Sequence, residues 1–138
     1  MSVLQLDVRQ ILPSHFSDAE AVLGEPTGVF PVDPGDVQEL PLGGEQRDYG
    51  IDGFDITVFY VPGGVSRRLH IIGHWGDGYT LVDWPDILAS LGLASLGPPN
   101  AVGVDAEWWW DNEYRYDIAI MTSMVDDRIW SIAIIAIP

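Results

Sequence analysis

The sequence contains no cysteine and no lysine, and each absence excludes a class of chemistry. Without cysteine, neither disulfide bonds nor thiolate catalysis is available to the chain. Without lysine, all 6 basic residues are arginines; they face 21 acidic residues, and the net charge is −15. Such a surface repels the phosphates of nucleic acids and of anionic membranes, so we expect neither as a partner.

Long apolar runs are missing as well. Residues 129–137 are apolar but have only the length of a strand, far below the roughly 18–20 residues of a membrane helix. The first residues lack the basic region and the apolar core of a signal peptide, so we expect a cytoplasmic protein. Two explanations of the acidity stay open. It reflects either a general bias of the host organism towards acidic proteins or the recruitment of a basic partner.

What the chain does contain is a pattern that occurs twice. Both halves begin a helix near a proline, end it at an LGxP sequence (residues 23–26 and 96–99), and continue with strands. With 47% hydrophobic residues the chain is long and apolar enough for a core of its own. We therefore expect one domain, residues 1–138, with pseudo-repeats at about 1–74 and 79–138.

The predicted fold class is α+β. Each repeat reads as a helix followed by a three-stranded antiparallel meander, and the two tandem units together form one antiparallel sheet with both helices packed on one face. Residues 3–8 suggest a short leading strand. Residues 27–45 are rich in proline and glycine and show no periodicity, which predicts a long surface loop.

This order of elements resembles the tandem fold of β-lactamase inhibitor proteins and the related single-unit SmpA/OmlA (BamE-like) domains. The resemblance is carried by the two LGxP helix ends, by the aromatic strand at residues 108–110, and by the final strand after a charged turn at residues 127–132. It implies a protein that binds other proteins on the open face of its sheet, with no particular target. The disulfides and the secretory or lipoprotein signals of those families are absent here.

Patterns for catalysis and metal binding are weak. His70 and His74 lie around the end of a strand, where a spacing of four does not bring them to one metal, and His74 with Asp77 is thin support for zinc. The carboxylates do not follow the spacing of a calcium loop, and the paired glycines lack the Lys-Ser/Thr of a phosphate loop. We predict no catalytic residues, no metal, no cofactor and no enzymatic activity.

Residues 104–117 combine three consecutive tryptophans with a series of acids. Alternation with the even positions inward predicts that Trp108 and Trp110 face the helices, and it places Trp109 outward among carboxylates. An exposed tryptophan in such a ring is typical of an interaction hot spot. The alternative is that Trp109 folds onto a loop or a neighbouring strand.

The same alternation predicts an open sheet face with a shallow concavity over the small residues Ala119, Ser131 and Ala133. The residues predicted to bind a partner are Asp55, Phe59, Arg68, His70, Asp105, Glu107, Trp109, Asp111, Glu113, Asp117 and Met121.

These observations favour a non-catalytic protein-binding module. We expect an inhibitor or a toxin-neutralising immunity protein that covers a basic partner, such as a toxin or an enzyme, with its acidic and aromatic sheet face. Two alternatives stay open at this point. One is a structural homodimer, and the other is a small-ligand or metal-binding protein that uses the concavity.

Overall fold

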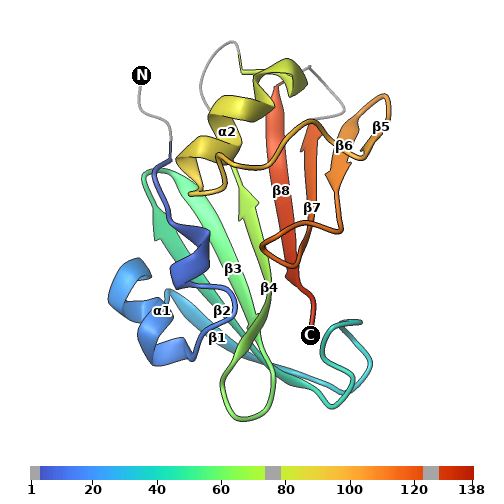
Figure 1. The fold of residues 1–138 in the computed structure, drawn as a ribbon. Coiled ribbons are helices and arrows are strands. Elements are labelled where there is room, and N and C mark those ends of the chain that lie inside the picture. Colours follow the sequence, from blue (N-terminus) through green and yellow to red (C-terminus); the bar gives the residue numbers. More distant parts are fainter. Residues whose placement is uncertain (1–3, 74–78, 123–127) are drawn as a thin grey trace.

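Eight strands form a single antiparallel sheet in the order β1-β2-β3-β4-β8-β7-β6-β5 (Figure 1). The computed structural model describes residues 4–73, 79–122 and 128–138. The strands are β1 (Gly28–Val32), β2 (Gly44–Ile51), β3 (Phe54–Tyr60), β4 (Ser66–Ile72), β5 (Ala101–Val102), β6 (Ala106–Trp109), β7 (Tyr116–Thr122) and β8 (Ile129–Ala136). The helical elements are η1 (Val8–Gln10), α1 (Phe16–Leu23), η2 (Leu81–Asp83) and α2 (Trp84–Ser90).

This architecture shows that the predicted α+β class of two helix-plus-three-strand units is wrong. The protein is β-rich: each half contributes four strands, and α1 and α2 have only eight and seven residues. Glycine limits both helices: Gly24 directly follows α1, Gly92 follows α2 after Leu91, and both adopt positive φ angles. In the part of the chain that the structure describes, no helix is long and apolar enough to cross a membrane.

The strands that were not predicted are β1 and β5. β1 lies within residues 27–45, where glycine and Pro31 hide the strand pattern, and Pro31 is tolerated because β1 is an edge strand. β5 has only two residues, too few for any periodicity to appear. Residues 4–7 do not join the sheet; instead the Leu6 amide donates to the carbonyl of Ser90 over 2.9 Å.

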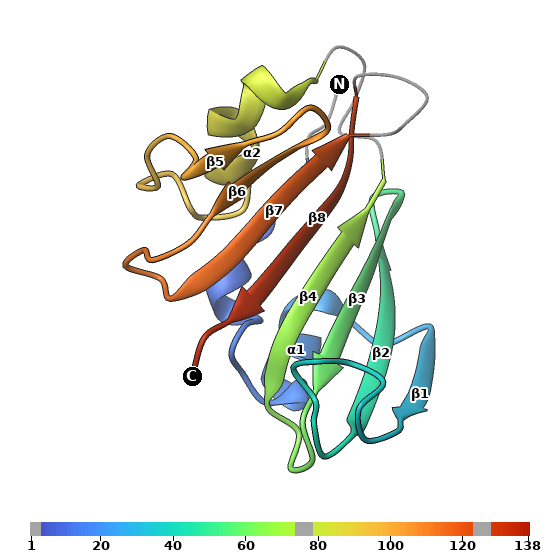
Figure 2. The same ribbon diagram turned by 90° about the vertical axis from the view of Figure 1, so that its right-hand side faces the viewer.

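The two halves of the chain meet in the centre of the sheet. The first half forms the meander β1 to β4, the second forms β5 to β8, and β4 pairs with β8 (Figure 2). Ile71 lies opposite Ile132 in this pair, and Leu69 lies opposite Ile134. The last strand of each half is therefore buried between neighbours, whereas β1 and β5 form the edges.

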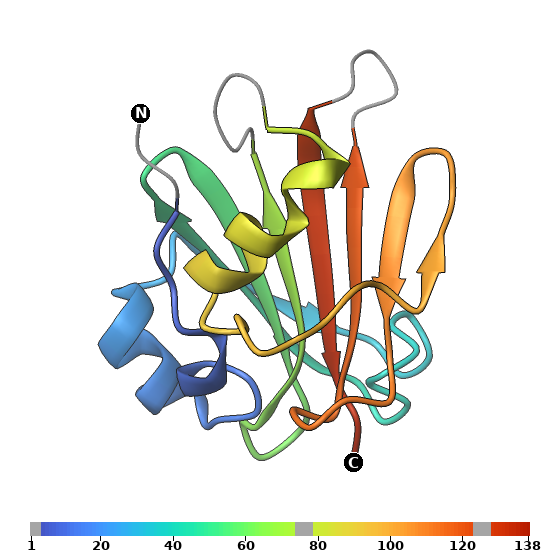
Figure 3. The ribbon, with the colours of Figure 1, turned by 45° about the horizontal axis from the view of Figure 1, so that its top comes forward.

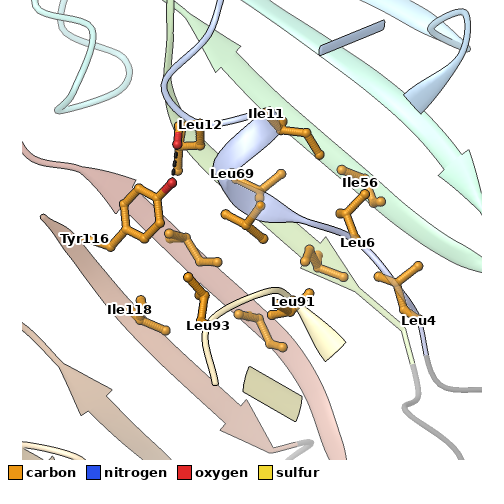
Figure 4. Packing of buried hydrophobic residues seen from close by; sticks show 14 of the residues in the cluster. Leu4, Leu6, Ile11, Leu12, Ile56, Leu69, Leu91, Leu93, Tyr116 and Ile118 are labelled. Atoms are coloured by element: carbon orange, nitrogen blue, oxygen red, sulfur yellow. Dashed lines mark hydrogen bonds between the residues drawn. The ribbon is translucent and has the colours of Figure 1, made fainter. Parts of the chain in front are cut away.

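Both helices and the N-terminal segment lie on one face of the sheet (Figure 3), and the core fills the space beneath them. Tyr116 closes this core from the second half, since its hydroxyl donates to the carbonyl of Leu12 (Figure 4). The aliphatic residues that alternate along the four central strands are buried beneath the helices: Ile56, Val58, Leu69, Ile71, Ile118, Ile120, Ile132 and Ile134. The opposite face of the sheet, here called the open face, carries no helix among the described residues.

Candidate functional site

The three consecutive tryptophans face in the opposite sense to that predicted. Trp109 is 2% exposed and belongs to the core, whereas Trp108 and Trp110 are 39% and 45% exposed. The indole Nε1 of Trp109 donates to the carbonyl of Gly97 over 3.0 Å, and its ring lies 5.8 Å from that of Trp84. Trp109 is therefore not the exposed hot spot, and the exposed aromatic pair is Trp108 and Trp110.

The register of β6 explains this orientation. Trp109 lies opposite Ile118, which is buried under the helices, and Trp108 lies opposite Ala119 on the open face. With three adjacent tryptophans, either the middle one or the outer two can face inward, so no local signal in the sequence distinguishes the two orientations. The inward position gives one indole N–H a backbone acceptor, which a buried tryptophan needs.

The same register turns Glu107 inward, against the prediction that it lies on the open face. Glu107 lies opposite Ile120 and is 7% exposed, and its Oε2 atom has no hydrogen-bond partner among the described residues. Burial raises the pKa of this carboxyl group above its ordinary value. Glu107 thus belongs to the helix side of the sheet and is unavailable to a partner on the open face.

The open face of the second half holds a groove of about 510 Å³. Trp108 and Trp110 stand beside it, and Ala119 and Ala133, which lie opposite each other on β7 and β8, give it a low floor. The residues that line it are Trp108, Trp109, Trp110, Asp117, Ile118, Ala119, Ala133 and Ile135. The shallow concavity over Ala119 and Ala133 is thus present, and two aromatic side chains wall it on the β6 side.

Asp117 supplies the charge of this groove. It lies on β7 opposite Ile135, its side chain is exposed, and within the described residues it takes part in no ion pair. Arg115, two residues away, donates instead to the carbonyl of Pro138. The carboxylate of Asp117 is therefore available to a ligand in the groove.

The open face of the first half is covered by the chain itself. The loop formed by residues 33–43, here called the covering loop, crosses in front of the sheet (Figure 2). Its Glu39 accepts a hydrogen bond of 2.5 Å from Arg68, and its Leu40 is fully buried. Phe59, predicted to be open, is only 8% exposed beneath this cover.

Arg68 and His70 are engaged within the same cover. Arg68 Nε donates to His70 Nε2 over 2.7 Å, so this ring nitrogen carries no proton. Burial, with the adjacent charge of Arg68, lowers the pKa of His70, and Glu39 opposes this shift. Arg68 therefore ties the covering loop to the sheet through Glu39, and His70 accepts a hydrogen bond from Arg68, so both predicted binding residues are already engaged within the chain.

The remaining predicted site residues are spread around the sheet. Asp55, Asp105, Asp111 and Glu113 are exposed, and Met121 is half-buried. Of these acids, Glu113 already accepts a 2.6 Å hydrogen bond from Ser95. His74 and Asp77 lie outside the described residues. Across residues 4–73, 79–122 and 128–138, no group of three or more His, Asp or Glu side chains is placed to hold a metal ion.

Comparisons with known proteins concern the fold. No family model matches the chain, and no curated protein matches it. A DUF4309-family protein (YjgB) from Bacillus subtilis is similar in structure, with 18% identity, a TM-score of 0.48, and coverage of 90% of this chain and 79% of that one. A cysteine-rich secretory protein from Staphylococcus aureus has 9% identity and a TM-score of 0.51, with coverage of 99% of this chain and 51% of that one. The chain thus spans about half the length of the second protein, and this likeness is one of fold alone.

Proposed function

We propose that this chain is a non-catalytic protein-binding module of the inhibitor or immunity type. It binds its partner with the open face of the second half, where Trp108 and Trp110 flank the groove. This proposal rests above all on the exposure of these two rings on a sheet face whose other half is covered. Exposed tryptophan beside an apolar floor is the composition of binding hot spots. The β-lactamase inhibitor resemblance remains a prediction.

The charge of the chain defines the partner. With a net charge of −15, the protein attracts a basic protein over long distances and repels an acidic one. Such steering acts mainly on the association rate and weakens as salt screens the charges. A basic toxin or enzyme that this protein neutralises by covering it fits the proposal best.

The test is capture from a lysate of the host with the tagged chain, followed by reconstitution with the purified partner. We expect a basic protein that binds at low salt, is released at high salt, and forms a 1:1 complex by calorimetry. The double variant Trp108→Ala/Trp110→Ala is expected to weaken this complex at least about 100-fold, because hot-spot residues carry most of the binding free energy. Loss of the partner's activity in the complex would support the inhibitor role.

Phe30→Ala is the matched control. Phe30 is 49% exposed on β1, at the far edge of the sheet, so its removal is expected to leave the complex intact. A complex that is equally tight with the double variant would contradict the proposal. So would a purified chain that forms a dimer through Trp108 and Trp110 in sedimentation experiments and captures no partner.

A further inference from the structure

The groove on the open face is lined by aromatic rings at its side and by small apolar residues at its floor. Trp108 and Trp110 contribute half-exposed indole rings, and Ala119 and Ala133 contribute an apolar floor. Among the described residues that line the groove, Asp117 is the one with a charge. Indole faces attract cations through their π-electrons, and a carboxylate attracts them directly. The indole rings and the carboxylate therefore both favour a cation as the occupant of the groove.

The charge of Asp117 separates a neutral occupant from a cationic one. A neutral side chain that fills the groove takes water away from the carboxylate without supplying a counter-charge, which costs free energy. A cation restores both the counter-charge and the hydrogen-bond donors. The chain's own neighbouring arginines do not supply it, since Arg68 pairs with Glu39 and Arg115 donates to the carbonyl of Pro138.

We infer that the groove receives an arginine side chain of the partner protein. Its guanidinium plane stacks on the indole rings of Trp108 and Trp110, and its N–H groups donate to Asp117. The methylene stem then lies on the floor formed by Ala119 and Ala133. A planar guanidinium stacks on aromatic rings and pairs with a carboxylate in one geometry, which a lysine ammonium does not do. This inference deepens the proposed function and rests on it.

The test uses the whole chain labelled with ¹⁵N and two peptides, acetyl-Gly-Arg-Gly-amide and its citrulline counterpart. Citrulline has nearly the shape of arginine but no charge. We expect the arginine peptide to shift the indole N–H signals of Trp108 and Trp110 in a saturable manner, with a Kd in the millimolar range. The signal of the buried Trp109 is the internal reference and is expected to stay in place.

Two charge variants sharpen the result. Asp117→Asn is expected to weaken binding of the arginine peptide about threefold to tenfold. Asp55→Asn removes one exposed carboxylate from the open face of the first half, so it matches the change in net charge and is expected to leave binding unchanged. Equal weakening by both variants would show a general charge effect and overturn the inference.

Two further outcomes would also overturn it. One is a citrulline peptide that shifts both indole signals as strongly as the arginine peptide. The other is the absence of any shift at about 50 mM arginine peptide, well above the expected Kd. In either case a captured partner that still depends on Trp108 and Trp110 would leave the proposed function standing. The failure of the inference is thereby distinguished from the failure of that function.

Discussion

The two halves of the open face differ in one connection. Between β1 and β2 the chain makes the covering loop of residues 33–43, whereas residues 103–105 alone join β5 to β6. In the first half the face carries the cation Arg68, and the loop brings Glu39 and the apolar Leu40 to it. In the second half the face carries Asp117 and two exposed tryptophans. The described residues that line its groove belong to β6, β7 and β8 or, in the case of Trp110, directly follow β6.

The difference shows what a cover of this sheet must supply. It brings an apolar side chain for the flat surface and a charge opposite to the one that the strands present. The first half obtains both from its own chain. By analogy, we propose that the second half receives its cation and its apolar contacts from another molecule, the partner protein. The covering loop is thus an internal example of the binding that we propose.

The largest effect is expected from removing the apolar contact of the covering loop. Leu40→Ala empties a fully buried site and is expected to lower the free energy of unfolding by about 3 kcal/mol, as in other buried leucine truncations. Urea denaturation measures this loss. Leu42→Ala in the same loop is the control, because Leu42 is 79% exposed and its truncation is expected to cost less than about 0.5 kcal/mol. Equal losses in both variants would mean that Leu40 does not anchor the loop.

On the helix-covered face of the sheet, the two halves differ in whether a charged side chain has a partner. Arg47 in the first half is paired with Glu20 at 2.7 Å, whereas Oε2 of the buried Glu107 in the second half has no hydrogen-bond partner within the part of the chain that the structure describes. We expect Glu107→Gln to raise the free energy of unfolding at pH 7 by about 1 kcal/mol, because it removes an unpaired buried charge. Asp105→Asn, at an exposed position, is the control and is expected to change little.

The pH dependence of the Glu107→Gln effect follows from the pKa shift. Burial raises the pKa of Glu107 in the folded state above the ordinary value of 4.5, so folding favours its protonated form. The stability that this group contributes is fully present below pH 4.5 and is lost as the pH rises through the folded-state pKa. The advantage of the Glu107→Gln variant is therefore expected at pH 7 and not at pH 4. An advantage of equal size at both values would argue against a buried charge.

The smallest effect is expected from His70, which tests how the covering loop responds to pH. Its pKa is lowered in the folded state, so the stability it contributes is present above pH 6.5 and is lost as the pH falls through the folded-state pKa. His70→Gln keeps a neutral acceptor for Arg68 and is expected to abolish this part of the pH dependence. The measurement is the difference in unfolding free energy between wild type and variant from pH 7 to pH 5. An unchanged difference would show that His70 does not titrate with folding.

The central strands were predictable because their environment is uniform. Ile56, Leu69, Ile118 and Ile132 alternate with polar or small residues, and each lies beneath the helices as that alternation requires. A period of two needs only one buried face, and these strands provide it along most of their length. The inward orientation of these four side chains therefore follows from local patterns, whereas the pairing register, which shifts at Tyr60 and at Thr122, does not.

The candidate site was less predictable because it depends on contacts that are distant in the sequence. Trp109 turns inward to reach the carbonyl of Gly97 and the ring of Trp84, and neither contact leaves a trace in the residues around it. Glu107 follows it inward although a carboxylate is normally placed outside. The position of the covering loop likewise depends on the ion pair between Glu39 and Arg68, which the periodicity of the sequence does not predict.

The pairing of β4 with β8 has a consequence for folding during synthesis on the ribosome. β4 ends at Ile72, yet the strand that covers its edge begins at Ile129. While the intervening residues are being synthesised, the hydrogen-bonding groups along that edge have no native partner. The wait is much shorter for β7, which ends at Thr122 and is followed closely by β8. Strand edges of this kind join readily to other chains. The outer edge of β4 is therefore open to pairing with other chains until β8 has been synthesised.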